Sequence, residues 1–417
     1  MSSFKKANIM LPKNADLSKW SVVACDQYTS QPDYWKDVEN LVGDAPSTLN
    51  ITFPEVYLSE GDSRIKKINQ TMDEYINEGI FKEHKNSLIY VERTIDGNKT
   101  RKGLVGAIDL EDYDFSVGSG SKVRATEGTV LDRIPPRVKI RENAPMELPH
   151  VMILIDDEKK DIIESLTLSK DKMEKIYDFD LIKGGGHLTG YLLTDDLADE
   201  VISKLDVLET QDEFDKRYNT SGIKPLTYAV GDGNHSLATA KTCWENLKKT
   251  LSEEEIKTHP ARFALCEIEN IHDSALEFEP IHRVVFDIDA DDLLKSMKEY
   301  YETTDTPNGG QCIEYITEKG EGKLYIKNPK SQLVVGTLQI FLDDYLKDNK
   351  GEVDYIHGED VCRKLGSESG NIGFVLPAME KSDLFLGVIK DGVLPRKTFS
   401  MGEAYEKRFY LEAKMIK

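Results

Sequence analysis

Short apolar runs and amphipathic segments alternate along the whole chain. The apolar runs predict strands over residues 21–25, 87–91, 104–108, 151–155, 189–193 and 226–230. Apolar residues at helical spacing predict helices over residues 65–76, 159–177, 195–208, 212–218, 236–249, 291–301 and 359–365. This mixture predicts an α/β or α+β protein built from mixed-sheet lobes, rather than a helical bundle or a β-sandwich.

Two further features indicate how the predicted strands are arranged. The turn Asp96-Gly97-Asn98 is expected to join the strands at 87–91 and 104–108 as a hairpin. The run 151–155 is apolar at every position, as in a strand whose sheet is covered on both faces.

The length of the chain, 417 residues, predicts two or three domains or lobes. We expect an N-terminal α/β lobe over residues 1–155 and a central lobe over residues 156–275. A C-terminal α/β lobe over residues 276–417 is expected to pack on the other two.

The charge of the chain limits its partners. The sequence has 54 basic and 75 acidic residues, so its formal net charge is −21. Binding to nucleic acid depends on cationic side chains that displace counterions from phosphates, so a general nucleic-acid partner is excluded as the leading interpretation. The same charge disfavours an anionic membrane surface. Any anionic ligand therefore needs a local positive cluster.

The cysteines and the apolar runs predict a cytoplasmic protein. The five cysteines are odd in number and lack CxxC spacing, which argues against a disulfide framework and a thiolate zinc site. The most apolar strand-like run, 151–155, is far shorter than the roughly 20 residues of a membrane span. Cys25 beside Asp26 is a candidate nucleophile, although no activating histidine or lysine adjoins it in the sequence.

The clearest local signal is a glycine-flanked corner between a predicted strand and a predicted helix. Gly231 and Gly233 permit unusual backbone angles and a close approach of a ligand to the main chain. The unpaired N–H groups at the start of the following helix favour an anion such as a phosphate. Asp232, Asn234 and His235 would project polar groups toward it.

A simpler interpretation of the same corner stays open. Asp232 and Asn234 would then serve only as turn and N-cap residues, and His235 would be an ordinary histidine at a helix start. The spacing of the glycines matches neither a P-loop nor a Rossmann fingerprint, so it does not identify a nucleotide class.

A second cluster concentrates positive charge in this acidic chain. Arg124 and Arg133 have the planar fork that suits phosphate or carboxylate recognition, and Glu127 is a candidate general base. The alternative is that the cluster is a solvated surface. In that alternative, Arg137, Lys139 and Arg141 alternate along a strand with one face in water, and we favour it for Lys139 and Arg141.

Three further places carry candidate polar groups. The segment 183–187 either wraps a phosphate or turns a corner, and the corner is favoured because no helix follows directly. His282 and Arg283 stand at the mouth of an apolar strand, where Arg283 would reach an anion. Lys397 lies in a small basic turn that is either solvated surface or a phosphate contact.

The histidines give no support for a zinc site built by the protein, because neither HxxxH nor HxH spacing occurs. Mg²⁺ that arrives with a phosphate needs only one or two carboxylates. Mg²⁺ brought by a phosphate therefore stays open as a cofactor, and a nucleotide or another compound as the phosphate donor is what the family resemblance described next implies.

Three segments together carry a resemblance to a known family. They are 231–235 (Gly-Asp-Gly-Asn-His), 280–283 (Pro-Ile-His-Arg) and 394–398 (Leu-Pro-Arg-Lys-Thr), in this order along the chain. The chain resembles the domain-of-unknown-function 1015 family, whose central motif usually reads Asp-Gly-His-His-Arg. That motif resembles the glycine corner of the ParB/sulfiredoxin superfamily, which includes partition CTPases, sulfiredoxins and kinases that act on free serine.

The resemblance implies phosphate chemistry and assigns roles to matching positions. Asp232, Gly233 and His235 take the roles of the corner, which in the serine kinases binds nucleotide phosphates and the hydroxyl substrate. Asn234 stands where the family has its first histidine, and Ser236 stands where it has arginine. Arg283 or Arg133 would then supply the missing positive charge, and Glu127 would be the base.

The function expected from this resemblance is phosphoryl transfer, by a kinase or a phosphatase, on a small hydroxylated metabolite. Serine or phosphoserine is the leading candidate, and the partner is a small phosphorylated molecule rather than a nucleic acid or a membrane. The alternative is a non-catalytic regulator that binds a nucleotide or metabolite at the same corner. A ParB-like nuclease or DNA-binding protein conflicts with the net charge of −21.

Overall fold

A computed structural model describes residues 2–95 and 99–417, so the predicted turn Asp96-Gly97-Asn98 lies outside the described residues. The chain forms two compact units, each described here by itself. Unit 1 contains Met1–Leu276 and Glu403–Lys417, and unit 2 contains Glu277–Gly402. The last residues of the chain therefore belong with the N-terminal part.

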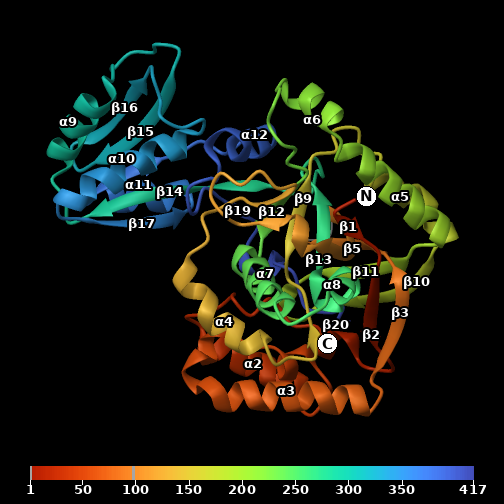
Figure 1. The fold of residues 1–417 in the computed structure, drawn as a ribbon. Helices are drawn as coiled ribbons and strands as arrows, with labels where there is room; N and C mark the ends of the chain where they lie inside the picture. The colour runs from red at the N-terminus through yellow and green to blue at the C-terminus, as the bar shows by residue number, and fades with distance from the viewer. Residues whose placement is uncertain (1, 96–98) are drawn as a thin grey trace. The chain divides into compact units, whose positions relative to one another are not determined.

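A ten-stranded mixed sheet forms the centre of unit 1 (Figure 1). Its strands lie in the order β10-β11-β4-β5-β13-β9-β12-β7-β6, with β1 paired to β5. In chain order they are β1 (Phe4–Lys5), β4 (Ile89–Ile95), β5 (Lys99–Asp109), β6 (Tyr113–Asp114), β7 (Val123–Ala125), β9 (Met152–Ile155), β10 (Glu174–Asp180), β11 (His187–Leu192), β12 (Tyr228–Asp232) and β13 (Phe263–Asn270). The pairs β12–β7, β6–β7 and β13–β9 are parallel, and the other pairs are antiparallel. The sheet thus combines strands from residues 1–155 with strands from residues 156–275.

Helices and two small ribbons surround this sheet. The helices of unit 1 are α1 (Leu17–Trp20), α2 (Pro32–Val42), α3 (Gly61–Asn77), α4 (Ile134–Arg141), α5 (Asp195–Leu208), α6 (Gln211–Tyr218), α7 (Asn234–Lys248) and α8 (Glu253–Thr258). Its 3-10 turns are η1 (Thr48–Ile51), η2 (Glu55–Glu60), η3 (Leu110–Asp112), η4 (Leu131–Arg133), η5 (Glu164–Lys172), η6 (Ile182–Gly184), η7 (Pro260–Arg262) and η8 (Ala404–Glu406). The ribbons pair β2 (Ala7–Pro12) with β3 (Phe81–Ser87), and β8 (Met146–Glu147) with β20 (Lys414–Met415).

Separate hydrophobic cores lie against the two faces of the sheet. In β5, Val105 and Ala107 belong to one core, whereas Leu104 and Ile108 belong to the other. Successive side chains of a strand point to opposite faces, so this division follows directly from the strand geometry. Because both faces are covered, the strands carry continuous apolar runs, and the predicted strand at 151–155 is confirmed as β9.

Unit 2 contains a six-stranded antiparallel sheet in the order β16-β15-β18-β14-β17, with β19 paired to β14. Its strands are β14 (Phe278–Phe286), β15 (Gln311–Thr317), β16 (Gly320–Ile326), β17 (Glu352–His357), β18 (Ile372–Val375) and β19 (Phe399–Met401). Its helices are α9 (Ala290–Tyr301), α10 (Val334–Asp348), α11 (Glu359–Gly366) and α12 (Lys381–Asp391). The mixed α/β fold class predicted from the sequence is confirmed.

Helices with clear capping signals were predicted closely. The helix predicted at 195–208 is α5, which has the same bounds. The Thr194 side chain accepts a hydrogen bond from the backbone N–H of Leu197, and Asp195 and Asp196 lie in the first turn. The helix predicted at 291–301 is α9, which the Asp289 side chain caps.

Three predicted elements were wrong. Residues 21–25 do not form a strand. Of these residues only Val23 is paired, in an isolated antiparallel bridge with Phe409. Residues 159–177 are no α-helix: the 3-10 segment η5 is followed by β10, because the backbone from Glu174 onward pairs with β11. Residues 137–141 lie in α4 rather than in a strand, since Pro135 and Pro136 favour a helix start.

Among the described residues, none of the helices has the length and apolar character needed to cross a membrane.

Candidate functional site

The predicted glycine corner joins β12 to α7. Gly233 adopts the left-handed conformation, with φ at 81°, and its N–H donates to the Asp232 carboxylate at 2.8 Å. A Cβ atom at this position would lie 3.0 Å from Cα of Val151, at the start of neighbouring β9. Both the backbone angle and the close approach of Val151 therefore require glycine here. Gly231 lies at a register shift between β12 and β9, where the strand is irregular.

The first turn of α7 has no side-chain cap within the described part of the chain. The first intrahelical bond runs from the N–H of Leu237 to the carbonyl of Gly233. The N–H groups of Asn234, His235 and Ser236 precede it, at the positive end of the helix dipole. These three residues are half-buried, so the turn is partly open to solvent and an anion can approach its N–H groups.

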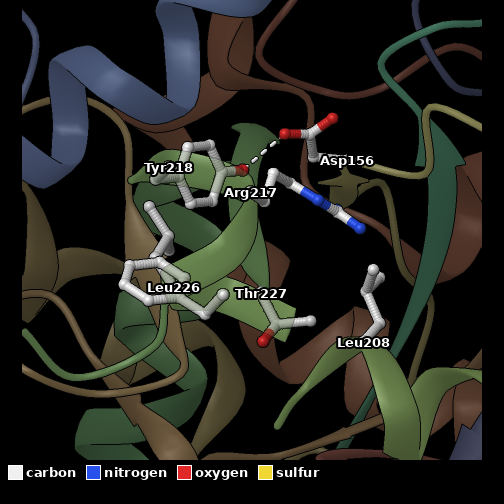
Figure 2. A pocket seen from close by; sticks show the side chains of 7 residues that line it. Asp156, Leu208, Arg217, Tyr218, Leu226 and Thr227 are labelled. Atoms are coloured by element: carbon white, nitrogen blue, oxygen red, sulfur yellow. Dashed lines mark hydrogen bonds between the residues drawn. The ribbon is translucent and has the colours of Figure 1, made fainter. Parts of the chain in front are cut away.

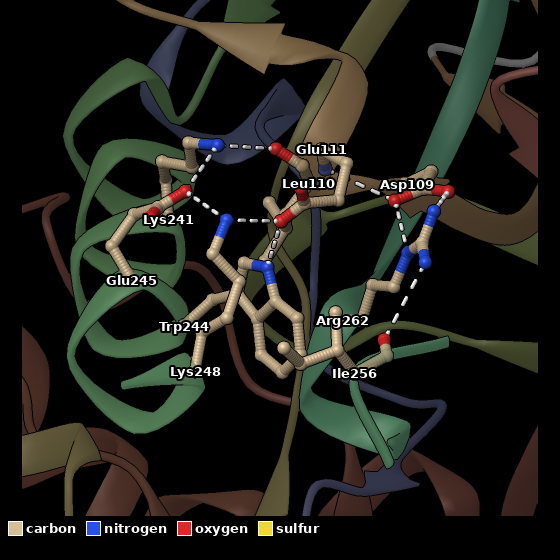
Figure 3. Close-up of polar contacts among 9 residues, drawn as sticks. All are labelled: Asp109, Leu110, Glu111, Lys241, Trp244, Glu245, Lys248, Ile256 and Arg262. Atoms are coloured by element: carbon tan, nitrogen blue, oxygen red, sulfur yellow. Dashed lines mark hydrogen bonds and ion pairs between the residues drawn. The ribbon is translucent and has the colours of Figure 1, made fainter. Parts of the chain in front are cut away.

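The body of α7 is fixed to the sheet by polar contacts (Figure 3). Glu111 in η3 accepts from the indole of Trp244 at 2.5 Å and from Lys248 at 2.8 Å. Lys241 donates to the carbonyl of Leu110 at 2.8 Å. The N-terminus of α7 therefore belongs to a helix whose second half is anchored by polar contacts to η3 and its carbonyls.

The register of β7 and β12 brings Glu127 to the same edge as Asp232. The two strands are parallel, and Ala125 is paired with Val230. The Thr126 hydroxyl then donates to the carbonyl of Val230 at 2.7 Å, which continues the pairing by one residue. Glu127 and Asp232 follow at the carboxyl ends of adjacent parallel strands. The structure thus places the backbones of Glu127 and Asp232, which are far apart in the sequence, at the same edge of the sheet.

His235 points toward the segment that follows Glu127. Its Nε2 accepts a hydrogen bond from the backbone N–H of Val130 at 3.3 Å. Burial lowers the pKa of His235, and the positive charges of Arg137 and Arg133 lower it further. The imidazole is therefore neutral at pH 7, and the bond at Nε2 leaves its proton on Nδ1. Arg133, predicted as a phosphate-binding residue, thus acts electrostatically on His235.

Two polar atoms near the corner have unmet hydrogen-bonding capacity. The side-chain oxygens of Asn234 and Thr129 are buried and have no hydrogen-bond partner in the described residues. A buried polar atom without a partner is costly, so such atoms are commonly satisfied by a ligand or water.

The sequence analysis missed a further group of charged residues at this site. Lys407 Nζ lies 3.4 Å from the Asp232 carboxylate, and His150 Nε2 lies 3.9 Å from Asp26. The negative charge of Asp26 partly offsets the lowering of the His235 pKa. Asp26, His150 and Lys407 therefore border the corner from segments remote in the sequence.

Asp26 stays ionised although burial disfavours its charged form. Burial raises its pKa, but the charge of His150, a hydrogen bond from Gln27 and the charge of Lys407 outweigh burial, so the pKa is lower than usual. A signal for His150 was present in the sequence, because it stands immediately before the predicted strand at 151–155. Lys407 had no comparable signal.

Cys25 is held as a protonated thiol. Its Sγ lies 2.9 Å from the hydroxyl of Tyr410, whose oxygen also accepts from the backbone N–H of Cys25 at 3.1 Å. Burial, followed by the charge of Asp26, raises the pKa of Cys25 to about 12. These features argue against a nucleophilic thiolate.

Arg124, another predicted phosphate contact, is used inside the protein. Its guanidinium donates to the carbonyls of Ser121 at 2.7 Å and Lys224 at 2.8 Å, and the side chain is buried. Burial lowers its pKa. The structure thus does not bring the Arg124 guanidinium to the Asp232 corner.

His282, Arg283 and Lys397 belong to unit 2. Arg283 is fully buried and donates to the carbonyls of Ile281, Lys397 and Arg396 at 2.5, 2.9 and 3.0 Å. The ring nitrogen Nδ1 of His282 accepts from the N–H of Leu376 at 3.1 Å, and burial lowers the pKa of His282. Within unit 2, Arg283 anchors the turn that carries Lys397.

The segment 183–187 forms the corner before β11. Its His187 lies between two carboxylates, with Nδ1 2.7 Å from Asp180 and Nε2 2.6 Å from Asp178. Hydrogen bonds to Asp180 and Asp178 raise the pKa of His187.

A small hollow lies at the other end of β12 (Figure 2). Leu226 and Thr227, which precede the strand, line it together with Asp156 and Tyr218. The Tyr218 hydroxyl donates to Asp156. This hollow is separate from the residues that build the Asp232 corner.

The residues that the structure describes contain no group of three or more histidine, cysteine, aspartate or glutamate side chains arranged to hold a metal. A Mg²⁺ ion bound chiefly through phosphate and water needs only one or two protein carboxylates, and Asp232 is the carboxylate placed at the corner.

A model of the family described as "Protein of unknown function (DUF1015)" matches residues 7–345. A search of the curated proteins gave no match.

Several solved structures show low similarity to the chain. SbnI from Staphylococcus aureus, with a C-terminal truncation, is 8% identical, with a TM-score of 0.35 over 74% of this chain and 82% of its own. A free serine kinase in complex with AMP is 11% identical, with a TM-score of 0.38 over 73% and 90%. A conserved hypothetical protein from Pyrococcus furiosus is 13% identical, with a TM-score of 0.33 over the same shares.

Proposed function

The chain belongs to the DUF1015 family, and we propose that it transfers a phosphoryl group to or from a small hydroxylated metabolite, with serine or phosphoserine as the leading candidate. One observation carries this proposal. Glu127 and Asp232 leave adjacent parallel strands beside the uncapped first turn of α7. This placement supports the proposal, because it puts a candidate proton acceptor and the amides of a helix N-terminus at the same edge of the sheet.

The proposed mechanism depends on positioning and electrostatics. The amides of the first turn of α7 bind oxygens of the phosphoryl group, and the helix dipole stabilises their charge. Glu127 accepts the proton of the substrate hydroxyl, so that the oxygen can attack phosphorus as the bond to the leaving group breaks. The neutral His235 donates a hydrogen bond through Nδ1–H, since Nε2 already accepts from Val130.

The phosphate donor is a nucleotide or another phosphorylated compound. Asp232 would hold Mg²⁺ with it, and the ion would neutralise phosphate charge when bound.

A direct assay tests the proposal in both directions. The protein is incubated with Mg²⁺, serine and a panel of donors that includes ATP, ADP and inorganic pyrophosphate, and phosphoserine is followed by ³¹P NMR. The reverse assay follows phosphate release from phosphoserine and other phosphorylated metabolites. We expect turnover in one direction and its loss in His235→Ala. No turnover together with unchanged ligand binding in His235→Ala would refute the proposal.

Binding without turnover would favour the second candidate, a non-catalytic sensor of a nucleotide or metabolite. The replacement of the family's usual histidine and arginine by Asn234 and Ser236 favours that alternative. Thermal stabilisation by a nucleotide, in the absence of any product, distinguishes the sensor from the enzyme.

A further inference from the structure

The C-terminal segment that carries Lys407 is fixed by a buried arginine. Arg93 donates to the carbonyl of Lys407 at 2.6 Å and to that of Tyr405 at 2.7 Å. Its Nε and NH2 groups also bind the carbonyl of Gly185 at 3.1 and 2.9 Å. The guanidinium of Arg93 lies 5.1 Å from the ring centre of Phe409. The backbone at Lys407 is therefore held on both sides.

The next residue, Arg408, connects this segment to His150. Arg408 is buried and paired with Glu267 and Glu412, each at 2.7 Å. Its remaining NH1 group donates to the carbonyl of Pro149, which immediately precedes His150. The same guanidinium thus fixes the backbone beside Lys407 and beside His150.

The Lys407 ammonium faces the Asp232 carboxylate. It is 3.4 Å from Asp232, longer than the roughly 2.7–2.9 Å of a tight charge-assisted hydrogen bond. Its charge also lowers the pKa of Asp26. The lysine side chain is only 14% exposed, so this positive charge is concentrated at the corner rather than in bulk solvent.

Within unit 1, two of the cations expected from the sequence are placed differently. Arg124 binds backbone carbonyls, and the Arg133 side chain is exposed. Ser236 stands where the family usually has arginine.

We propose that Lys407 is the phosphate-binding cation of this site and replaces the arginine absent at position 236. The inference rests on the proposed function and adds to it a specific binding residue. Asp232 pairs with the ammonium when no anion is bound, and a phosphate then takes the other donors of the same ammonium. The anchors at Arg93 and Arg408 hold Lys407 in place before the ligand arrives, which reduces the entropy lost on binding.

The test compares phosphorylated probes with their unphosphorylated counterparts. Affinities for ADP, adenosine, phosphoserine and serine are measured by calorimetry in the absence of Mg²⁺. We expect Lys407→Met to weaken the binding of the phosphorylated probe about tenfold or more, because a hydrogen bond to a charged group is lost. Binding of the unphosphorylated counterpart is expected to change less than threefold. Lys407→Arg keeps the charge and is expected to retain most of the affinity.

Two further variants keep the test decisive. Lys257→Met removes an exposed lysine paired with Glu254 on α8 and is the matched control, with no expected change. Asp232→Asn breaks the same ion pair from the other side. Asp232→Asn is expected to bind the phosphorylated probe as tightly as the wild type or more tightly. If the ion pair were purely structural, Lys407→Met and Asp232→Asn would weaken binding alike.

The outcomes separate this inference from the function on which it rests. If the wild type binds a phosphorylated probe and Lys407→Met binds it equally well, Lys407 is not the cation, and the proposed function stands. A parallel loss of affinity in Lys407→Met and Asp232→Asn would also overturn the role of Lys407. If the wild type binds none of the probes and shows no turnover, the proposed function fails, and the role of Lys407 fails with it.

Discussion

The hydroxyl of Thr126 donates to the carbonyl of Val230 at 2.7 Å, and this bond ties the end of β7 to the end of β12. Both residues are buried. The bond extends the parallel pairing beyond Ala125 and directs the following residues to one edge of the sheet. The position of Glu127 relative to Asp232 therefore depends on the Thr126 side chain, which need not contact any ligand.

Thr126→Val should therefore lower both stability and activity. The substitution keeps the volume but deprives the Val230 carbonyl of a buried donor, at a cost of about 1–3 kcal/mol in the free energy of unfolding. Urea unfolding followed by tryptophan fluorescence measures this change. Thr250→Val is the control, because Thr250 is exposed and its hydroxyl bonds only a nearby carbonyl at the end of α7. Equal stability of the two variants would contradict the assigned role of Thr126.

Glu127→Gln is expected to separate binding from chemistry. The amide keeps the size of the side chain but cannot accept the proton of the substrate hydroxyl, so turnover should fall by about 100-fold or more. Affinity for the phosphorylated ligand should change little. Glu158→Gln, at an exposed carboxylate of unit 1, should retain full turnover. Activity retained in Glu127→Gln would assign the base to another residue, of which Asp232 is the other candidate carboxylate.

Local signals account for what the sequence predicted correctly. The bounds of α5 follow from Thr194 and the two aspartates after it, and the start of α7 follows from Gly233. The helix predicted at 159–177 failed because its apolar residues fit helical and alternating patterns alike, and pairing with β11 selected the strand. Such a choice depends on a partner that is distant in the sequence.

The contrast between local signals and partners distant in the sequence also applies to the candidate site. The corner at 231–236 was predictable because turn, polar residues and helix start are contiguous. Lys407 was not predictable, since it reaches Asp232 only through the anchoring of the C-terminal segment by Arg93 and the bridge between Val23 and Phe409. Arg124 illustrates the opposite error, because an arginine in a suggestive motif binds backbone carbonyls instead.

The lowered pKa of His235 predicts a specific dependence of stability on pH. Burial, together with the charges of Arg137 and Arg133, makes the folded protein bind this proton less readily than the unfolded chain. The stability contribution is therefore fully present above the unfolded pKa of about 6.5 and is lost as the pH falls toward the lower folded value. His235→Gln should show a smaller loss of stability between pH 7 and pH 5. Urea midpoints measured at several pH values test this, and identical slopes for the variant and the wild type would contradict it.

Arg283 is predicted to be a structural residue of unit 2. Arg283→Met would leave the carbonyls of Ile281, Lys397 and Arg396 without their buried donor, which should cost about 3 kcal/mol or more. Arg133→Met, at an exposed side chain, should change stability by less than about 0.5 kcal/mol. Limited proteolysis and urea unfolding measure both variants. A stable Arg283→Met protein would instead indicate that its neighbours satisfy those carbonyls in another way.

Cys25 is expected to be dispensable for chemistry although it lies beside the site. Its pKa of about 12, raised by burial and by Asp26, keeps the thiol protonated at physiological pH, and a protonated thiol is a poor nucleophile. Cys25→Ser should therefore retain turnover within a few-fold, because a hydroxyl can still bond to Tyr410. In the folded wild type, iodoacetamide should modify Cys25 at pH 8 far more slowly than in the urea-unfolded chain, as mass spectrometry of peptides would show. Abolished turnover in a stably folded Cys25→Ser protein, together with rapid alkylation of Cys25, would reverse this assignment and make the thiol part of the reaction.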